Sequence, residues 1–320
     1  MSGLHVVLGS NGGTGSAVLE ELTRRGLPAR GVTRSGTGFQ PEGTELVGAD
    51  ITDVDQLVAA LAGASVVYQC AQPSYTRWPQ EFPQMNRTIV KAAAAVGAKL
   101  VFADNLYMYA PGTNPMREDS PATAQGKKGR TRVEMAAELL RAHADGELRV
   151  AIGRASDYYG PRGPDSGLGE RVFAWVLKGK KLSWLGSLDQ PHTVSYLPDV
   201  ARGLVTLGTR DEADGKVWHL PAGPTVTGRE FLTAVCDAAG RPHRFSTVQP
   251  AMLKIAGMFS PMIREIKETT YQWTGPWIVD TSRFQSAFGP FTETPMADAV
   301  RNGRGLVGSS IDGSDGPAGI

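Results

Sequence analysis

The start of this chain constrains its fold more than any other stretch. A short apolar run at 4–9 leads into a turn with glycines at 9, 12 and 15, and residues 13–26 then carry apolar side chains at helical spacing. A tight turn, a close approach of the backbone to a pyrophosphate and close helix–strand packing each exclude a Cβ atom. The free N–H groups at the helix start would face the anion. This context predicts a dinucleotide-binding site, the alternative being a purely structural glycine turn.

The first half of the chain continues in the same alternation of apolar runs and helical patterns. This alternation is typical of βαβ units, and near-continuous apolar strands indicate a parallel sheet with helices on both faces. The predicted strands are 4–9, 29–34, 44–50, 65–71, 99–105 and 148–154, and the predicted helices are 13–26, 53–63, 82–97 and 127–145. We therefore expect an α/β fold.

Composition narrows the choice of partner. The 33 Lys and Arg nearly balance the 32 Asp and Glu, so no net field favours nucleic acid or an anionic membrane as a partner. No apolar run approaches the roughly 20 residues that span a bilayer. Cys70 and Cys236 lack metal-site spacing, so we expect no metal and a reducing, cytoplasmic location. A small-molecule substrate fits this balance best.

The end of the second predicted strand bears on which dinucleotide binds. An acid there would bond the ribose of NAD, but the sequence has Arg34, which favours the 2′-phosphate of NADP. The alternative is an ordinary exposed arginine. Asp50 and Ile51 follow the third strand, where they would meet the adenine, although Asp50 also suits a cap. The predicted cofactor-binding residues are Gly9, Ser10, Asn11, Gly12, Gly13, Thr14, Gly15, Arg34, Asp50, Ile51, Ala71 and Gln72.

Four stretches together resemble one family. They are "GSNGGTG" at 9–15, "GAD" at 48–50, "NLYMYAP" at 105–111 and "GRASDYYGP" at 153–161. The chain resembles the extended short-chain dehydrogenase/reductases, the NAD(P)-dependent epimerase/dehydratase group. The resemblance implies a Rossmann domain, a doubly wound parallel sheet, with a smaller C-terminal substrate-binding region. We place the Rossmann domain at 1–158 with 190–220 returning to it, the substrate region at 159–189 and 221–304, and a disordered tail at 305–320.

The chain departs from the family at the expected catalytic residues. The family uses a Ser or Thr, then a Tyr and a Lys four residues apart on a helix, whereas the matching positions here are Asn105, Lys128 and Arg132. Cations at a helix start oppose the helix dipole, and such a broken rule often marks a functional site. Lys128 could donate a proton and Arg132 could bond ribose or phosphate. The alternative is a mobile basic loop.

Other side chains at the carboxyl ends of the predicted strands complete the candidate site. Tyr107 is a candidate proton donor, while Tyr75, Tyr158 and His192 are candidate substrate contacts. His192 also suits a packing role. Tyr109 matches a family tyrosine that is commonly structural.

The resemblance and these departures lead to one leading function. We expect an atypical NADPH-dependent oxidoreductase acting on a small, apolar carbonyl, imine or enone-type substrate. The alternatives are a non-catalytic NADP-binding sensor or scaffold and, less favoured because the Tyr/Lys pair is absent, a nucleotide-sugar epimerase or dehydratase. A homodimer is a further expectation.

Overall fold

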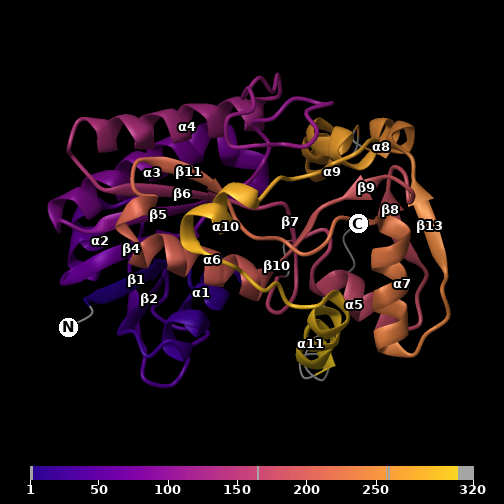
Figure 1. Ribbon diagram of the computed structural model, residues 1–320, viewed down its shortest axis with the longest axis horizontal. Coiled ribbons are helices and arrows are strands. Elements are labelled where there is room, and N and C mark those ends of the chain that lie inside the picture. The colour runs from indigo at the N-terminus through magenta and orange to yellow at the C-terminus, as the bar shows by residue number, and fades with distance from the viewer. Residues whose placement is uncertain (1–2, 164–165, 257, 259, 309–320) are drawn as a thin grey trace.

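A parallel sheet with helices on both faces forms one half of the molecule (Figure 1). A computed structural model describes residues 3–163, 166–256, 258 and 260–308. The seven strands are ordered β11-β6-β5-β4-β1-β2-β3, and every pairing is parallel. Their bounds are β1 Leu4–Leu8, β2 Ala29–Thr33, β3 Glu45–Gly48, β4 Ala64–Gln69, β5 Lys99–Asp104, β6 Val150–Arg154 and β11 Lys216–His219. The order reverses between β1 and β4, which is the position where doubly wound sheets bind ligands.

Alternate residues of the central strand enter different cores. Val6 and Leu8 of β1 pack into the core beneath α2, α3 and α4, whereas Val7 packs into the core beneath α1 and α6. Both faces of the sheet are thus buried, as the apolar strands predicted. The covering helices are α1 Gly13–Arg24, α2 Val54–Ala60, α3 Trp78–Ala95, α4 Lys127–Ala144 and α6 Leu197–Thr209.

The predicted boundaries differ most from the structure at the start of α3, at the end of α2 and at the C-terminal end of the chain. Helix α3 was expected from residue 82 but begins at Trp78, because Pro79 lies in the first turn, where its missing N–H costs nothing. Residues 305–308, expected in the disordered tail, belong to α11 Met296–Gly308. The rest of that predicted tail, 309–320, lies outside the described residues.

The C-terminal half of the chain builds a second core beside the sheet (Figure 1). Its center is made by aromatic and aliphatic side chains such as Phe173, Trp184 and Phe231. Its elements are β7 Asp157–Tyr159, α5 Glu170–Leu177, β8 Leu182–Leu185, β9 Pro191–His192, β10 Val194–Tyr196, β12 Val226–Thr227, α7 Gly228–Ala239, β13 Phe245–Val248, α8 Pro250–Ala256, α9 Pro261–Ile266 and α11. Three 3-10 turns, η1 Tyr75–Arg77, η2 Asp211–Ala213 and η3 Lys267–Trp273, and helix α10 Ser282–Phe288 complete the described chain.

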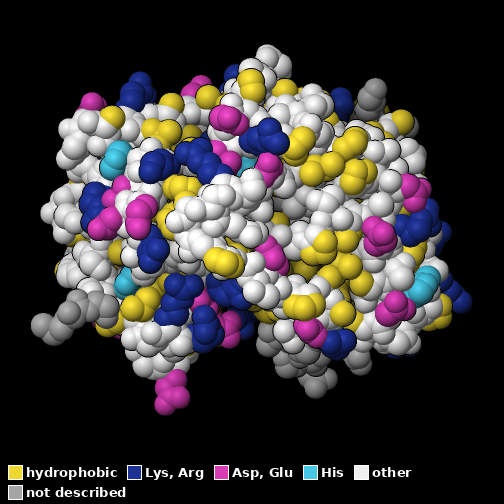
Figure 2. All heavy atoms as spheres, viewed as in Figure 1, with side chains coloured by type: hydrophobic (Ala, Val, Ile, Leu, Met, Phe, Trp, Pro, Cys, Tyr) yellow, Lys and Arg dark blue, Asp and Glu magenta, His cyan; other side chains and the backbone are white. Residues whose placement is uncertain are grey.

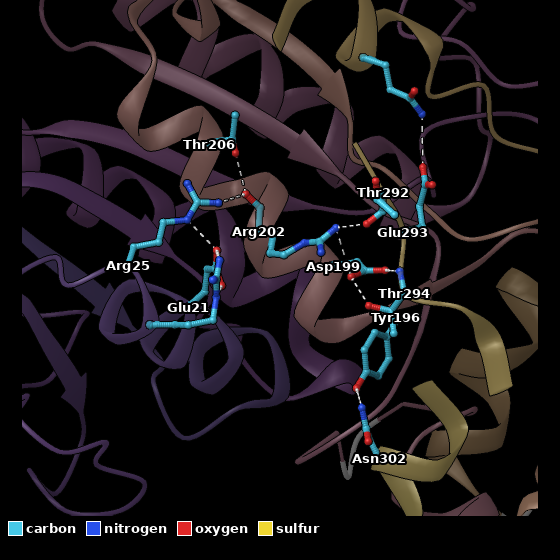
Figure 3. Close-up of polar contacts among 12 residues, drawn as sticks. Glu21, Arg25, Tyr196, Asp199, Arg202, Thr206, Thr292, Glu293, Thr294 and Asn302 are labelled. Atoms are coloured by element: carbon cyan, nitrogen blue, oxygen red, sulfur yellow. Dashed lines mark hydrogen bonds and ion pairs between the residues drawn. The ribbon is translucent and has the colours of Figure 1, made fainter. Parts of the chain in front are cut away.

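The two halves are tied by hydrogen bonds on α6 (Figure 3). Buried Asp199 accepts from the backbone N–H of Thr294 at 2.7 Å and from its Oγ1 at 2.8 Å. Arg202, one turn further on, donates to the carbonyl of Thr292. The segment between α10 and α11 is therefore fixed to a helix that also packs on the sheet.

On the face shown in Figure 2, hydrophobic side chains gather where Figure 1 places α8 and α9. Three exposed methionines, Met252, Met258 and Met262, belong to this segment. Among the described residues, no helix is both long and apolar enough to cross a bilayer.

Candidate active site

The glycine turn after β1 has the geometry that a diphosphate site needs. Gly9 has a φ of +75°, and a Cβ on Gly15 would lie 2.2 Å from the Gly9 carbonyl oxygen. Both positions therefore exclude a side chain. Gly12 is the N-cap residue of α1 and offers no side chain to cap it, so N–H groups of the first helical turn stay available to an anion. Gly12, Gly13 and Thr14 line a cavity at this point.

The cavity has a volume of about 890 Å³ and runs over the carboxyl ends of the strands. Nine of the twelve predicted cofactor-binding residues line it: Gly9, Gly12, Gly13, Thr14, Arg34, Asp50, Ile51, Ala71 and Gln72. The other three, Ser10, Asn11 and Gly15, do not line it. Gly15 packs against Gly9, Ser10 is fully buried, and Asn11 holds the loop after β2 through Thr37 and Phe39 at 2.9 Å each.

Arg34 and Asp50 mark one end of the cavity. Arg34 is exposed. The Asp50 carboxylate accepts hydrogen bonds from the Thr52 N–H at 2.9 Å and from its hydroxyl at 2.7 Å, and these bonds hold its pKa below the usual range. Asp50 thus forms a local turn. Asp53 caps α2 by accepting from the N–H groups of Asp55 and Gln56.

A buried ion cluster lies at the other end of the cavity. The Asp104 carboxylate bonds Arg132 at 3.2 Å and Arg154 at 3.1 Å, and it has no exposed surface. The Arg132 guanidinium lies 4.4 Å from the Trp78 ring centroid and 4.5 Å from that of Phe82. Burial lowers the pKa of Arg132, and Asp104 opposes this effect. Arg132 lines the cavity, and its Nε has no hydrogen-bond partner among the described residues.

Lys128 is buried, but the structure places it away from the proton-donating position expected from sequence. Its ammonium pairs with Glu265 and lies 4.4 Å from the Tyr75 ring centroid. Its backbone N–H donates to Glu268 Oε1 at 2.7 Å. Lys128 is not one of the described residues that line the cavity. A cation held by a carboxylate behind the wall cannot reach a substrate, so we do not retain Lys128 as a proton donor.

The predicted tyrosines divide into two groups. Tyr75, Tyr107 and Tyr158 line the cavity, and burial raises the pKa of each. Tyr109 lies elsewhere, where its hydroxyl bonds Arg154 at 3.0 Å and His219 at 2.8 Å, consistent with a structural role. Asn105 lines the cavity, but its Oδ1 is engaged by the Tyr107 N–H at 3.0 Å.

His192 lies behind the wall, and its partner is a residue that the sequence analysis did not select. His192 Nε2 is 2.8 Å from the Asp157 Oδ2, and its ring stacks on Trp273 with centroids 4.6 Å apart. Asp157 lines the cavity. The available signal was position, because Asp157 and Tyr158 both lie just beyond the carboxyl end of β6, which ends at Arg154. Its carboxylate brings an acid–base group to the inner end of the cavity.

Other chemistry at this site is limited. Cys70 lines the cavity, and burial raises the pKa of its thiol to about 12, so the thiol stays protonated. Within the described part of the chain, no cluster of three or more His, Cys, Asp or Glu side chains is placed to hold a metal ion.

Comparison with known proteins identifies the family. Residues 5–220 match the NAD-dependent epimerase/dehydratase family. The chain belongs to this family. Membership makes it an NAD-dependent enzyme of the extended short-chain dehydrogenase/reductase superfamily, and it agrees with the Rossmann sheet and the glycine turn.

The individual proteins that this chain resembles share little sequence identity with it. An uncharacterized protein of Sinorhizobium fredii, y4nL, is 23% identical over 309 residues, covering 83% of this chain and 85% of the relative. The UDP-glucose 4-epimerase of Thermus thermophilus, solved with NAD, is 19% identical with a TM-score of 0.76, and the match covers 96% of this chain and 99% of that one. The epimerase Mth375 of Methanothermobacter thermautotrophicus is 14% identical with a TM-score of 0.80, covering 97% and 94%. At these identities the solved structures establish the fold alone.

Proposed function

We propose that this epimerase/dehydratase family member is an NADP(H)-dependent oxidoreductase acting on a small, largely apolar carbonyl, imine or enone. One observation carries the proposal. A single cavity joins the glycine turn to an aromatic inner end. At the position of the family's Tyr this chain has Lys128, which does not line the cavity, and at the position of the family's Lys it has Arg132, which does. Nucleotide-sugar epimerisation or dehydration through a Tyr/Lys pair is disfavoured by these residues.

The residues around the cavity fit a nicotinamide dinucleotide. The uncapped start of α1 offers N–H donors to a diphosphate, and Gly12 leaves its backbone open there. The family and a solved relative point to NAD. Arg34, however, is exposed on the cavity wall and suits a 2′-phosphate, which supports NADP as the preferred form. Ala71 and Gln72, after β4, would face the nicotinamide side.

The inner end of the cavity suits a flat, apolar substrate with one polar atom. Its wall includes Tyr75, Trp78, Tyr107 and Trp277. Such surfaces bind apolar rings, while a few placed polar groups fix orientation. The Nε2 of Gln272, also on the wall, is buried without a hydrogen-bond partner among the described residues.

The chain's own groups would orient the reacting bond. The bound cofactor would supply a hydride. The Arg132 Nε–H and the Gln272 amide would hold a substrate oxygen, because both are unpartnered donors that lose nothing by turning to a ligand. Aromatic side chains would exclude water from the reacting carbon.

The test is a cofactor and substrate assay on the wild-type chain. NADPH oxidation is followed with benzaldehyde, cyclohexenone, dihydroisoquinoline and phenanthrenequinone, and affinities for NADPH and NADH are measured by calorimetry. We expect at least one compound to be reduced. An R34A variant should lose about tenfold in NADPH affinity, since a charge-assisted hydrogen bond contributes about 1.5 kcal/mol or more, while NADH affinity is unchanged.

The matched control is R87A, which removes an exposed arginine of α3 that does not line the cavity, as judged from the described residues. It should bind both cofactors as the wild type does. NADPH binding without any oxidation would favour a non-catalytic sensor. Equal loss of NADH and NADPH affinity in R34A would contradict recognition of the 2′-phosphate.

A further inference from the structure

We propose that Asp157, held in place by His192, is the group that exchanges a proton with the substrate oxygen. The inference rests on the proposed oxidoreductase function and assigns the step that the family's missing tyrosine leaves open. Asp157 is the first residue of β7 and follows directly on the carboxyl-end loop of β6, where parallel sheets place reacting groups.

The geometry fixes the carboxylate at the cavity wall. The Asp157 side chain is 20% exposed, whereas that of His192 is 3% exposed. The imidazole is held against the Trp273 ring and also meets the edge of Trp184 at 5.9 Å between centroids. With the ring fixed on both sides, the 2.8 Å bond to Nε2 orients the Asp157 carboxylate. A catalytic acid is effective only when it is positioned in this way.

Other carboxylates on the cavity wall are already engaged. Asp104 is held by two arginines, Glu81 pairs with Arg77 at 2.8 Å, and Asp50 forms its turn at the opposite end. Among the described residues on the wall near the inner end, Asp157 is the carboxylate with no guanidinium partner. Its carboxylate is therefore free of the guanidinium contacts that hold Asp104 and Glu81.

Tyrosines surround Asp157 but are poorly prepared for the step themselves. Tyr75, Tyr107, Tyr158 and Tyr271 all face it, and its negative charge adds to the burial that raises the pKa of each. In the family the Tyr is assisted by a nearby Lys, but here the position that matches the Lys holds Arg132, whose guanidinium pairs with Asp104. The charge of Arg132 lowers the pKa of Tyr107 and of Tyr158 less than burial raises it. A phenol with a raised pKa is a weaker acid, so proton transfer falls to the Asp157–His192 pair.

The proposed step balances with the cofactor as reductant. The bound dinucleotide would supply the hydride and its electron pair to the substrate carbon. The C=O π electrons move to oxygen, which takes a proton through Asp157 Oδ2 from the doubly protonated imidazole of His192, leaving a carboxylate and a neutral imidazole that keeps its Nδ1 proton. The pair is left one proton short and regains it from water, to which Asp157 is partly open. In the oxidation of an alcohol the same pair takes the hydroxyl proton.

The test compares substrates that need a proton with one that needs little help. In D157N, reduction of benzaldehyde, which must pass through an alkoxide, should lose about 10²- to 10⁴-fold in kcat, the usual contribution of general acid catalysis. Reduction of phenanthrenequinone, whose product anion is stabilised by its rings, should keep most of its rate. NADPH affinity measured by calorimetry should match the wild type, since Asn preserves the shape of the carboxylate.

A second readout needs neither substrate nor turnover. The proton on His192 Nε2 is buried and bonded, so proton NMR of the protein without cofactor should detect it as a slowly exchanging signal in the wild type and in D157N, and lose it in D157A. The matched control is D189N, which alters an exposed aspartate paired with Arg229 outside the cavity among the described residues. It should behave as the wild type in every assay.

The outcomes separate this assignment from the proposed function. If the wild type reduces benzaldehyde and D157N does so equally fast, Asp157 is not the proton donor, although the enzyme remains a reductase. An imidazole signal unchanged in D157A would likewise overturn the Asp157–His192 pair. If the wild type reduces none of the compounds, the proposed reaction itself fails, and this assignment fails with it.

Discussion

At the scale of single residues, the buried polar network fixes one histidine in the neutral state. Arg154 can only donate, so the Tyr109 hydroxyl accepts from it and donates its own proton to His219 Nε2 at 2.8 Å. His219 must then carry its proton on Nδ1, which lies 3.1 Å from the carbonyl oxygen of Asp280. Burial, aided by the charge of Arg154, lowers the pKa of His219 from 6.5 to about 4.

This shift predicts a pH dependence of stability. A histidine with a depressed folded-state pKa binds fewer protons than in the unfolded chain, so its contribution is present above pH 6.5 and is lost as pH falls toward 4. The wild type should lose about 3 kcal/mol of unfolding free energy over this window through His219. Urea unfolding at pH 7 and pH 4.5 should show a shallower pH slope in H219Q. The exposed-histidine variant H243Q is the control, and equal slopes in wild type and H219Q would contradict the assignment.

At the scale of elements, sequence patterns placed most of the sheet correctly because apolar strands and amphipathic helices are local signals. All six predicted strands, which are β1 to β6 of the structure, lie within two residues of their predicted ends. The carboxylates that contact the start of α4 could not be predicted from local patterns, because Glu265 and Glu268 lie more than 130 residues further along the chain than Lys128. These carboxylates supply the negative charge that the α4 N-terminus prefers.

The same distance in sequence explains what was missed at the site. Arg132 was selected from its family position and does line the cavity, but the burial of Lys128 beside Glu265 depends on packing between the two halves. Asp157 was passed over because nothing in the sequence shows that His192 lies against it. Position on a strand end is readable from sequence, whereas the partner of each side chain is not.

The pairing of Lys128 with Glu265 predicts coupled effects on stability. E265A should lower the free energy of unfolding by about 1–3 kcal/mol, less than for a fully buried pair, because Glu265 is 28% exposed. Adding K128M removes the stranded cation and should recover most of the loss. Urea unfolding measures both. E134A, which alters an exposed acid on the same helix, is the control, and a loss in E265A no larger than in E134A would show that the pair contributes nothing.

At the scale of the whole molecule, one sheet edge and one C-terminal region form a continuous site. The glycine turn and Arg34 come from the sheet half, and Asp157, Gln272 and Trp277 come from beyond it. The hydrogen bonds that Thr294 donates to Asp199 hold the C-terminal chain on α6 (Figure 3). The family's fold is retained while the polar groups at its reacting end are replaced.

The central claim is that a nicotinamide dinucleotide lies over the turn from Gly9 to Gly15. Its most direct test is calorimetry with NADPH, NADP⁺, NADH and NAD⁺ on the wild-type chain and on G12E, which would place a negative side chain where the cavity meets the start of α1. A Cβ on Gly12 would meet the Gly9 carbonyl oxygen at 3.5 Å, an ordinary contact. We predict one binding site per chain, tightest for NADPH, with binding lost in G12E while the unfolding temperature of the free protein changes little. No heat with any of the four nucleotides would contradict the account.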